Sequence, residues 1–318
     1  MCIQAEPLIV LAGPTAVGKT GLSLKIAEAV GGSVISADST QIYKELNIGS
    51  AKLLPEEQQG IPHYLIDVLE PEDPFDVTRF QKMAREAMRD IRDKGRVPIL
   101  TGGTGFYIQA VVRDIDFSES EGASSFREKW ECIAQEKGAE YVHAQLAAVD
   151  PEAAAQIHPN NIRRVIRALE FHEQTGGQIS QHNQEQHLRK SPWNTVYFVL
   201  NDDRSRLYEQ INARVDAMMQ DGLEEEVRRL AARGLTEEHS SMKGIGYKEF
   251  FPYFRGEYSL ERAVELIKQN TRHYAKRQLT WFRREPDVIW INKPEFAYDE
   301  DAMLAYMLRM YRERTCGG

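Results

Sequence analysis

Short apolar runs alternate with amphipathic stretches along much of this chain. The apolar runs predict buried strands at residues 8–12, 33–36, 97–100, 195–200 and 288–291. A helix is predicted over residues 19–30, with Gly31 at its end. A second begins after Asp76, a plausible N-cap, and Val77, Phe80 and Ala84 start its apolar face. Strands that alternate with helices favour a parallel sheet with helices on both faces.

The pattern changes between residues 117 and 192, where polar, helix-like stretches occur without a strong strand. A capped helix is predicted over residues 160–174, and an exposed connection over residues 178–190. The chain is again helical from residue 204 to residue 284. We therefore predict an α/β core domain, residues 1–116 and 193–318, with an inserted all-helical domain at residues 117–192.

A phosphate-binding loop follows the first predicted strand. Its pattern is G-x-x-x-x-G-K-T, placed between a strand and a helix, which predicts a P-loop-type parallel sheet flanked by helices. Backbone amides and the helix N-terminus would hold an anion, Lys19 would add a charge, and Thr20 could hold Mg²⁺. The predicted cradle consists of Gly13, Pro14, Thr15, Ala16, Val17, Gly18, Lys19 and Thr20.

The loop predicts phosphates but does not identify ATP. Nucleotide-hydrolysing enzymes usually end another strand in an aspartate that supports Mg²⁺, whereas the strand at 97–100 runs into Thr-Gly-Gly-Thr. A GTPase would carry Asn-Lys-x-Asp, and residues 292–295 read Asn-Lys-Pro-Glu. We interpret that segment as a turn at a strand end.

Asp38 and Thr104 each follow the carboxyl end of a predicted strand. In doubly wound folds these ends form the ligand crevice, on the edge where the phosphate loop opens. Asp38 could hold Mg²⁺ or take a proton from a nucleophile, or it could be a turn aspartate. Position alone leaves Thr104 equally open between a site hydroxyl and a turn hydroxyl.

Two segments combine cations with aromatic or apolar residues. Residues 160–174 carry Arg163, Arg164 and Arg167 beside an apolar set. Residues 271–284 contain Tyr274, Trp281 and Phe282 among the cations Arg272, Lys276, Arg277, Arg283 and Arg284. Cations for phosphates and flat rings for bases are typical of RNA recognition. Solvated helix faces with core aromatics explain each segment equally well.

Net charge and apolar content bear on whether the protein binds nucleic acid or enters a membrane. The chain has 318 residues and a net charge of −8, which argues weakly against nucleic acid, although a local basic surface matters more. No apolar run approaches the roughly 20 residues needed to span a bilayer. We expect a cytoplasmic protein that does not enter a membrane, and a monomer.

Taken together, the motifs resemble those of the bacterial tRNA dimethylallyltransferases, also called tRNA isopentenyltransferases. The resemblance runs from Pro7 to about Arg284, and as an ordered set it is highly specific. The matching segments are GPTAVGKT (13–20), DSTQIY (38–43), IGSAK (48–52), PHYLID (62–67), TGGTGFY (101–107), IRRVIRALE (162–170), GIGYKE (244–249) and RQLTWFR (277–283). Phe106 departs from the family, which has a smaller aliphatic residue there.

The resemblance implies transfer of a dimethylallyl group from dimethylallyl diphosphate, with Mg²⁺. The acceptor would be the exocyclic amine of the adenine 3′ to a tRNA anticodon. It makes Asp38 the general base, Thr104 its neighbour at the reacting centre, and residues 15–20 the diphosphate cradle, with Lys19 and Arg214 stabilising the leaving group. Contacts to the tRNA anticodon stem-loop are expected from Asp38, Ser39, Thr40, Gln41, Thr104, Arg127, Ile162, Arg163, Arg164, Val165 and Ile166, and the basic segment adds Arg272, Lys276, Arg277 and Arg283.

Rival interpretations remain at this point. A kinase of a small metabolite would share the sheet, the loop and an aspartate after the second strand. Prenyl transfer to free adenine nucleotides is a nearer alternative, against which the basic residues 271–284 favour a polymer. A non-catalytic RNA-binding module would leave the phosphate loop and Asp38 unexplained.

Overall fold

The computed structural model describes residues 6–117 and 123–316. It divides into two compact units. The first unit contains Met1–Val112 and Ser191–Gly318, and the second contains Arg113–Lys190. Each unit is described by itself.

The first unit is built on a wholly parallel sheet in the order β3-β2-β4-β1-β5-β6. The strands are β1 (Pro7–Ala12), β2 (Gly32–Ala37), β3 (His63–Tyr64), β4 (Val97–Gly102), β5 (Asn194–Asn201) and β6 (Val288–Asn292). The strands predicted near residues 8–12, 33–36, 97–100, 195–200 and 288–291 are confirmed. The sequence pattern did not reveal β3, because an alternation of apolar and polar residues cannot show over two residues.

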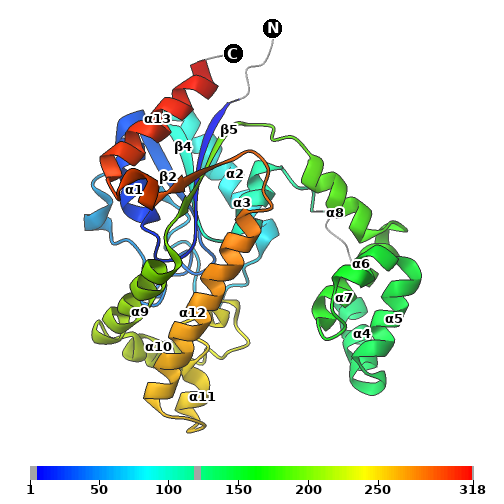
Figure 1. The fold of residues 1–318 in the computed structure, drawn as a ribbon. Coiled ribbons are helices and arrows are strands. Elements are labelled where there is room, and N and C mark those ends of the chain that lie inside the picture. The colour runs from blue at the N-terminus through cyan, green and yellow to red at the C-terminus, as the bar shows by residue number, and fades with distance from the viewer. Residues whose placement is uncertain (1–5, 118–122, 317–318) are drawn as a thin grey trace. The chain divides into compact units, whose positions relative to one another are not determined.

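Helices cover both faces of this sheet. Along β1, Leu8 and Val10 belong to one apolar core, with α2 (Val77–Asp93) and α3 (Gly105–Val112). Ile9 and Leu11 belong to the other, with α1 (Lys19–Val30) and α13 (Glu300–Cys316). Successive side chains of a strand point to opposite faces, so an apolar run such as β1 is buried between two layers (Figure 1). The predicted α/β fold is confirmed.

Four further helices gather below the sheet in Figure 1. They are α9 (Arg204–Gln220), α10 (Leu223–Ala232), α11 (Phe250–Phe254) and α12 (Leu260–Phe282). They contribute Val215, Val227 and Phe282 to the same core as α2. The predicted helical character of residues 204–284 is therefore confirmed, although a longer connection at residues 233–249, which contains a 3-10 turn (Ser240–Lys243), separates α10 from α11. The Asn292–Glu295 segment forms a 3-10 turn, Lys293–Phe296, after β6, as predicted.

The second unit is an insertion made of helices. These are α4 (Ala123–Lys137), α5 (Ala139–Val149), α6 (Pro151–Gln156), α7 (Ile162–Thr175) and α8 (Ile179–Leu188). Its own small core contains Val142, Leu146, Val165, Ile166 and Leu169. A helical insertion was predicted, and the buried apolar residues of this core come from one face of each of the helices α4 to α7.

Two details of the predicted insertion were wrong. Residues 178–190 are not a connection but contain α8, whose Gln, His and Glu residues give it no apolar face to recognise. The predicted helix at residues 160–174 begins two positions later, and its N-cap is Asn161, which makes no side-chain capping hydrogen bond. No helix in residues 6–117 or 123–316 is both long and apolar enough to cross a membrane.

Candidate active site

Glycine shapes the loop between β1 and α1. Gly13 has a φ of +151°, and a Cβ at this position would lie 2.8 Å from the Leu200 carbonyl oxygen of β5. Gly18 caps α1 in the left-handed region, with a φ of +94°. Other residues would be strained at both positions, so the two glycines let the loop turn its amides toward an anion at the helix N-terminus.

Lys19 is the first charged side chain of the loop. Its Nζ donates to the carbonyl oxygens of Gly13 at 3.0 Å and Pro14 at 2.8 Å. Burial lowers the pKa of Lys19 to about 7, with a smaller contribution from Arg214, while Asp38 opposes the shift. The ammonium group is therefore only partly populated near neutral pH, and an anion bound beside it would restore the charge.

Arg214 comes from α9, and its charge interacts with those of Lys19 and Asp38. Burial lowers its pKa, and the negative charge of Asp38 opposes that shift. Lys19, Arg214 and Asp38 thus act on one another, although they come from three separate segments of the chain. The site combines two cations, suited to a polyphosphate, with one carboxylate.

Asp38 stands immediately after β2, and its carboxylate is held in a turn. Its Oδ1 accepts hydrogen bonds from the Thr40 amide at 2.9 Å and the Thr40 hydroxyl at 2.6 Å. Asp38 is therefore a turn aspartate in its local geometry, which was one of the two interpretations left open by the sequence. The negative charge of Asp38 also interacts with the positive charges of Lys19 and Arg214. The turn therefore holds the carboxylate beside the phosphate loop.

Thr104 follows β4 at the same edge of the sheet. Ala12 of β1 and Ala37 of β2 are both register partners of Gly102 in β4, so the three strands end side by side. A Cβ on Gly102 would lie 2.4 Å from the Ala37 carbonyl oxygen, which only glycine permits. This close approach brings the segments that carry Asp38 and Thr104 together.

The inner face of α12 packs onto both loops. The Gln278 Oε1 accepts from the Thr15 amide at 2.9 Å, and its Nε2 donates to the Gly103 carbonyl at 2.9 Å. One turn earlier, burial raises the pKa of Tyr274 to about 12, with a smaller contribution from the charge of Asp38, while hydrogen bonds from Thr104 and Gln278 oppose the rise. Sequence reasoning named Tyr274 only as an aromatic residue of the basic segment 271–284 and missed Gln278, although their spacing of four on one helix face was visible.

A buried carboxylate organises the loop after Asp38. Glu226 of α10 accepts hydrogen bonds from the amides of Asn47, Ile48 and Gly49, at 3.0, 2.8 and 3.1 Å, and from the Tyr247 hydroxyl at 2.8 Å. A Cβ on Gly49 would lie 2.6 Å from the Tyr247 ring. The IGSAK and GIGYKE segments therefore meet at Glu226, which no motif had singled out.

Several residues expected to contact tRNA have internal partners. Gln41 accepts from the Ser36 hydroxyl at 2.9 Å and donates to the Ser50 carbonyl at 3.2 Å. Arg272 donates to the Asn212 side chain at 2.5 Å. Lys276, Arg277 and Arg283 are exposed on the outer face of α12 and after its end, whereas Ser39 and Thr40 are half-buried beside Asp38.

The residues of the insertion that were expected to contact tRNA are likewise partly exposed and partly engaged within the protein. Arg163 and Arg164 are exposed on α7, and Ile162 is half-buried. Val165 and Ile166 lie in the core with 1% and 2% of their surface exposed, so their side chains face inward. Arg127 and Arg167 both pair with the fully buried Glu170 carboxylate, Arg127 through two nitrogens at 2.9 and 3.0 Å.

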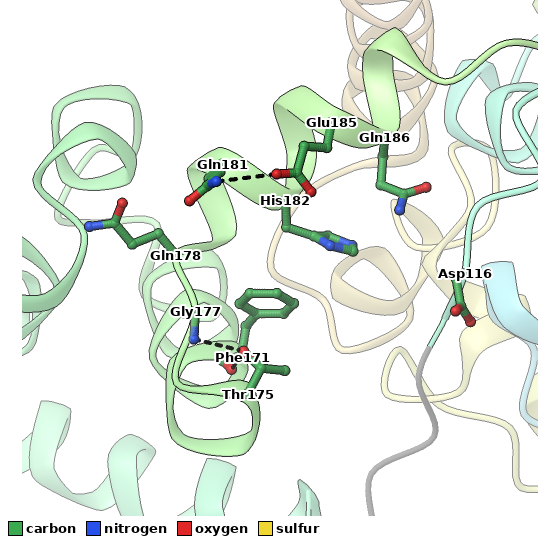
Figure 2. Close-up of a pocket in the computed structure, with 9 residues that line it drawn as sticks. All are labelled: Asp116, Phe171, Thr175, Gly177, Gln178, Gln181, His182, Glu185 and Gln186. Carbon is green, nitrogen blue, oxygen red and sulfur yellow. Dashed lines mark hydrogen bonds between the residues drawn. The ribbon is translucent and has the colours of Figure 1, made fainter.

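A pocket of about 440 Å³ is lined only by residues of the insertion, and none of them belongs to the phosphate loop. Figure 2 shows Phe171 and His182 side by side at its wall, with ring centroids 4.9 Å apart. Across the pocket lies Asp116, and Gln181 donates to Glu185 at 3.2 Å. None of the residues predicted for catalysis lines this pocket.

The described residues contain no group of three or more His, Cys, Asp or Glu side chains suited to a metal ion. A metal held mainly by substrate phosphates does not need such a cage. Thr20 is exposed in the first turn of α1, where its hydroxyl is available to share a metal with an anion in the loop. The residues therefore fit Mg²⁺ only as a partner of a bound polyphosphate.

Comparison with known proteins assigns the chain to a family. Residues 41–285 match the family model of IPP transferases. A tRNA dimethylallyltransferase from Lachnoclostridium phytofermentans is 51% identical over 310 residues, covering 97% of this chain and 98% of that protein.

Solved structures give the same answer. A tRNA isopentenylpyrophosphate transferase from Staphylococcus epidermidis is 40% identical, with a TM-score of 0.72 over 97% of this chain and 99% of that one. A eukaryotic dimethylallyltransferase acting on tRNA is 29% identical, with a TM-score of 0.77 over 91% of this chain and 74% of that one. The chain therefore belongs to the tRNA dimethylallyltransferase family, whose members are prenyl transferases.

Proposed function

We propose that the protein transfers a dimethylallyl group from dimethylallyl diphosphate to the exocyclic amine of the adenine 3′ to a tRNA anticodon, with release of diphosphate. The observation that carries this proposal is the grouping of Lys19 and Arg214 with the Asp38 carboxylate beside the phosphate loop. Two cations suit a diphosphate leaving group, and a carboxylate beside them suits an amine that must lose a proton. Family membership favours this activity over that of a metabolite kinase or a non-catalytic RNA-binding module.

The loop and the two cations act on the leaving group. When the bond between the prenyl carbon and the diphosphate oxygen breaks, negative charge develops on that oxygen. Lys19, Arg214 and the amides at the start of α1 stabilise this charge from fixed positions. Mg²⁺, held by the Thr20 hydroxyl together with diphosphate oxygens, would add a further positive charge.

Asp38 acts on the other side of the reaction. The adenine amine forms a bond to the prenyl carbon as the carbon–oxygen bond breaks, and it must give up one proton to end as a neutral secondary amine. The Asp38 carboxylate takes that proton, while Thr40 holds one of its oxygens in place. Thr104 follows the adjacent strand β4 and hydrogen-bonds to Tyr274 of α12. From there its side chain would contact the acceptor base.

Recognition of tRNA would use exposed cations of both units. The target base is stacked in the anticodon loop, so it has to be extruded, at a cost of a few kcal/mol, to reach the site. Lys276, Arg277 and Arg283 are exposed at α12, and Arg163 and Arg164 are exposed on the insertion. These side chains bind phosphates of the RNA, and the helical insertion at residues 117–192 serves as a domain for tRNA contact.

The choice of acceptor tests the proposal against its nearest rival. The purified protein is incubated with dimethylallyl diphosphate, Mg²⁺ and either AMP or an anticodon stem-loop RNA of equal adenine concentration. We expect prenylated RNA and negligible prenylated AMP. Equal or faster transfer to AMP would replace the tRNA assignment with synthesis of free prenylated nucleotides. Phosphoryl transfer in a parallel incubation with ATP, without prenyl transfer to either acceptor, would favour a kinase.

A further inference from the structure

Gln278 links two loops that the proposed reaction must keep in register. Its side chain comes from the inner face of α12 and is only 5% exposed. The carboxamide uses both ends, accepting from the Thr15 amide and donating to the Gly103 carbonyl, each at 2.9 Å. Thr15 belongs to the phosphate loop after β1, and Gly103 belongs to the turn after β4 that carries Thr104.

The surrounding residues are shaped to admit this side chain. A Cβ on Gly103 would lie 2.1 Å from the Gln278 Nε2, so glycine is required for the close approach. A Cβ on Gly105 would lie 2.2 Å from the Trp281 ring, which sits one turn further along α12. The Thr104 turn is therefore bounded by glycines that leave room for two side chains of the same helix face.

We propose that Gln278 is a positioning residue for prenyl transfer, which holds the phosphate loop and the Thr104 turn at the spacing that the reaction needs. The inference rests on the proposed function. The leaving diphosphate would sit on the first loop, and the acceptor amine would lie near the second, so the two hydrogen bonds of Gln278 set the distance between leaving group and nucleophile. Because its Oε1 accepts the hydrogen bond of the Thr15 amide, Gln278 also fixes the phosphate loop to α12 at this residue.

This role predicts a particular kinetic signature. Small errors of alignment cost rate much more than they cost binding, and a misplacement of about 1 Å can cost about 10²-fold. The amides at the start of α1 and the side chains of Lys19 and Arg214 bind the diphosphate without any contact from Gln278. Loss of Gln278 should therefore slow the chemical step while the affinity for diphosphate changes little.

The test compares Gln278→Met with a matched control, Gln81→Met, in the full-length protein. Methionine has nearly the shape of glutamine but forms neither hydrogen bond. Gln81 is equally buried, at 5% exposure, and donates to the Ala110 carbonyl of α3 at 2.7 Å, so its loss reports the stability effect alone. Single-turnover transfer to an anticodon stem-loop RNA gives the rate, titration with inorganic pyrophosphate gives the affinity, and thermal unfolding gives the stability.

We expect Gln278→Met to lower the single-turnover rate by about 10²-fold, with pyrophosphate affinity within about 3-fold of the parent. Gln81→Met should keep the parent rate. A rate for Gln278→Met close to that of the parent, or equal losses in both variants, would overturn the inference. If the parent itself transfers no prenyl group, the proposed function fails, which is a separate result.

Gln278→Glu covers the case in which the methionine variant is too unstable to assay. An ionised glutamate can accept from the Thr15 amide, but it repels the Gly103 carbonyl. Protonation turns it into a donor and restores the pair of bonds. The rate of Gln278→Glu relative to the parent should rise as the pH falls from about 8 to about 5.5. A ratio that does not change with pH would overturn the positioning role.

Discussion

At the scale of single residues, Asp38 carries the most specific claim of the mechanism. Asp38→Asn keeps the oxygen that accepts from Thr40 but removes the base. We expect the single-turnover rate to fall about 10²–10⁴-fold, the usual contribution of a positioned base, with pyrophosphate affinity little changed.

The matched control for this variant is Asp76→Asn. Asp76 caps α2 by accepting from the Arg79 amide, and asparagine caps a helix nearly as well. A parent-like rate is expected for it. A similarly small loss in Asp38→Asn would mean that water or another group takes the proton.

Lys19 makes diphosphate binding depend on pH. Its pKa is lowered to about 7 in the protein alone, and a bound diphosphate raises it by pairing with the ammonium form. Binding therefore takes up a proton, and affinity falls as the pH rises above about 7.

Calorimetric titration with pyrophosphate, in buffers of different ionisation enthalpy, measures this proton uptake. Lys19→Met is the control, since proton uptake by pyrophosphate itself occurs in both proteins and cancels in the comparison. The parent should take up more protons than Lys19→Met near pH 7.5. Equal uptake would show that Lys19 is fully charged before the ligand binds.

Some residues of the candidate site could be predicted from the sequence and others could not, for a physical reason. The residues Gly13–Thr20, Asp38 and Thr104 follow apolar strands, and parallel strands end at one edge, so their grouping follows from the pattern. Glu226 and Gln278 are ordinary helix residues whose partners are backbone groups of other segments. Nothing in the local sequence indicates such partners, because they depend on how α10 and α12 pack.

At the scale of elements, α10 stabilises the loop after β2 through Glu226. Glu226→Ala leaves the partly buried amides of residues 47–49 and the fully buried Tyr247 hydroxyl without an acceptor. A buried polar group left without its partner costs about 1–3 kcal/mol. We expect the free energy of unfolding to fall by at least about 3 kcal/mol, measured by urea denaturation.

Glu224, on the same helix, provides the comparison. It pairs with the exposed Arg228 and accepts from the Tyr253 hydroxyl. Surface pairs contribute about 0–1 kcal/mol, so Glu224→Ala should cost much less than Glu226→Ala. Equal losses in the two variants would show that the loop does not depend on Glu226.

Element prediction succeeded where a repeating apolar pattern was present. The strands β1, β2 and β4 are apolar because helices cover both faces of the sheet, and α2 shows a regular apolar face. The polar helix α8 and the two-residue strand β3 lack such a pattern. Both are defined by tertiary neighbours, which a periodicity analysis does not contain.

At the scale of the whole molecule, this protein has a negative net charge and yet is proposed to bind tRNA, which is itself negatively charged, through exposed arginine and lysine side chains. The net charge is −8, so binding depends on exposed groups such as Arg163 and Arg164 of α7. Replacing both with glutamine should weaken tRNA binding and reduce the slope of log K against log salt by about 1–2. Arg312→Gln, an exposed cation on α13, is the control and should leave the slope unchanged. An unchanged slope in the α7 variant would remove these arginines from the tRNA surface.

The proposed reaction transfers a prenyl group to one adenine of tRNA. It is tested most directly by mass spectrometry of nucleosides and of ribonuclease fragments, after unmodified tRNA is incubated with the protein, Mg²⁺ and dimethylallyl diphosphate. We expect the adenine 3′ to the anticodon to gain one five-carbon unit with the parent protein and none with Asp38→Asn. An unmodified adenine, with a folded protein that binds pyrophosphate and tRNA, would contradict it.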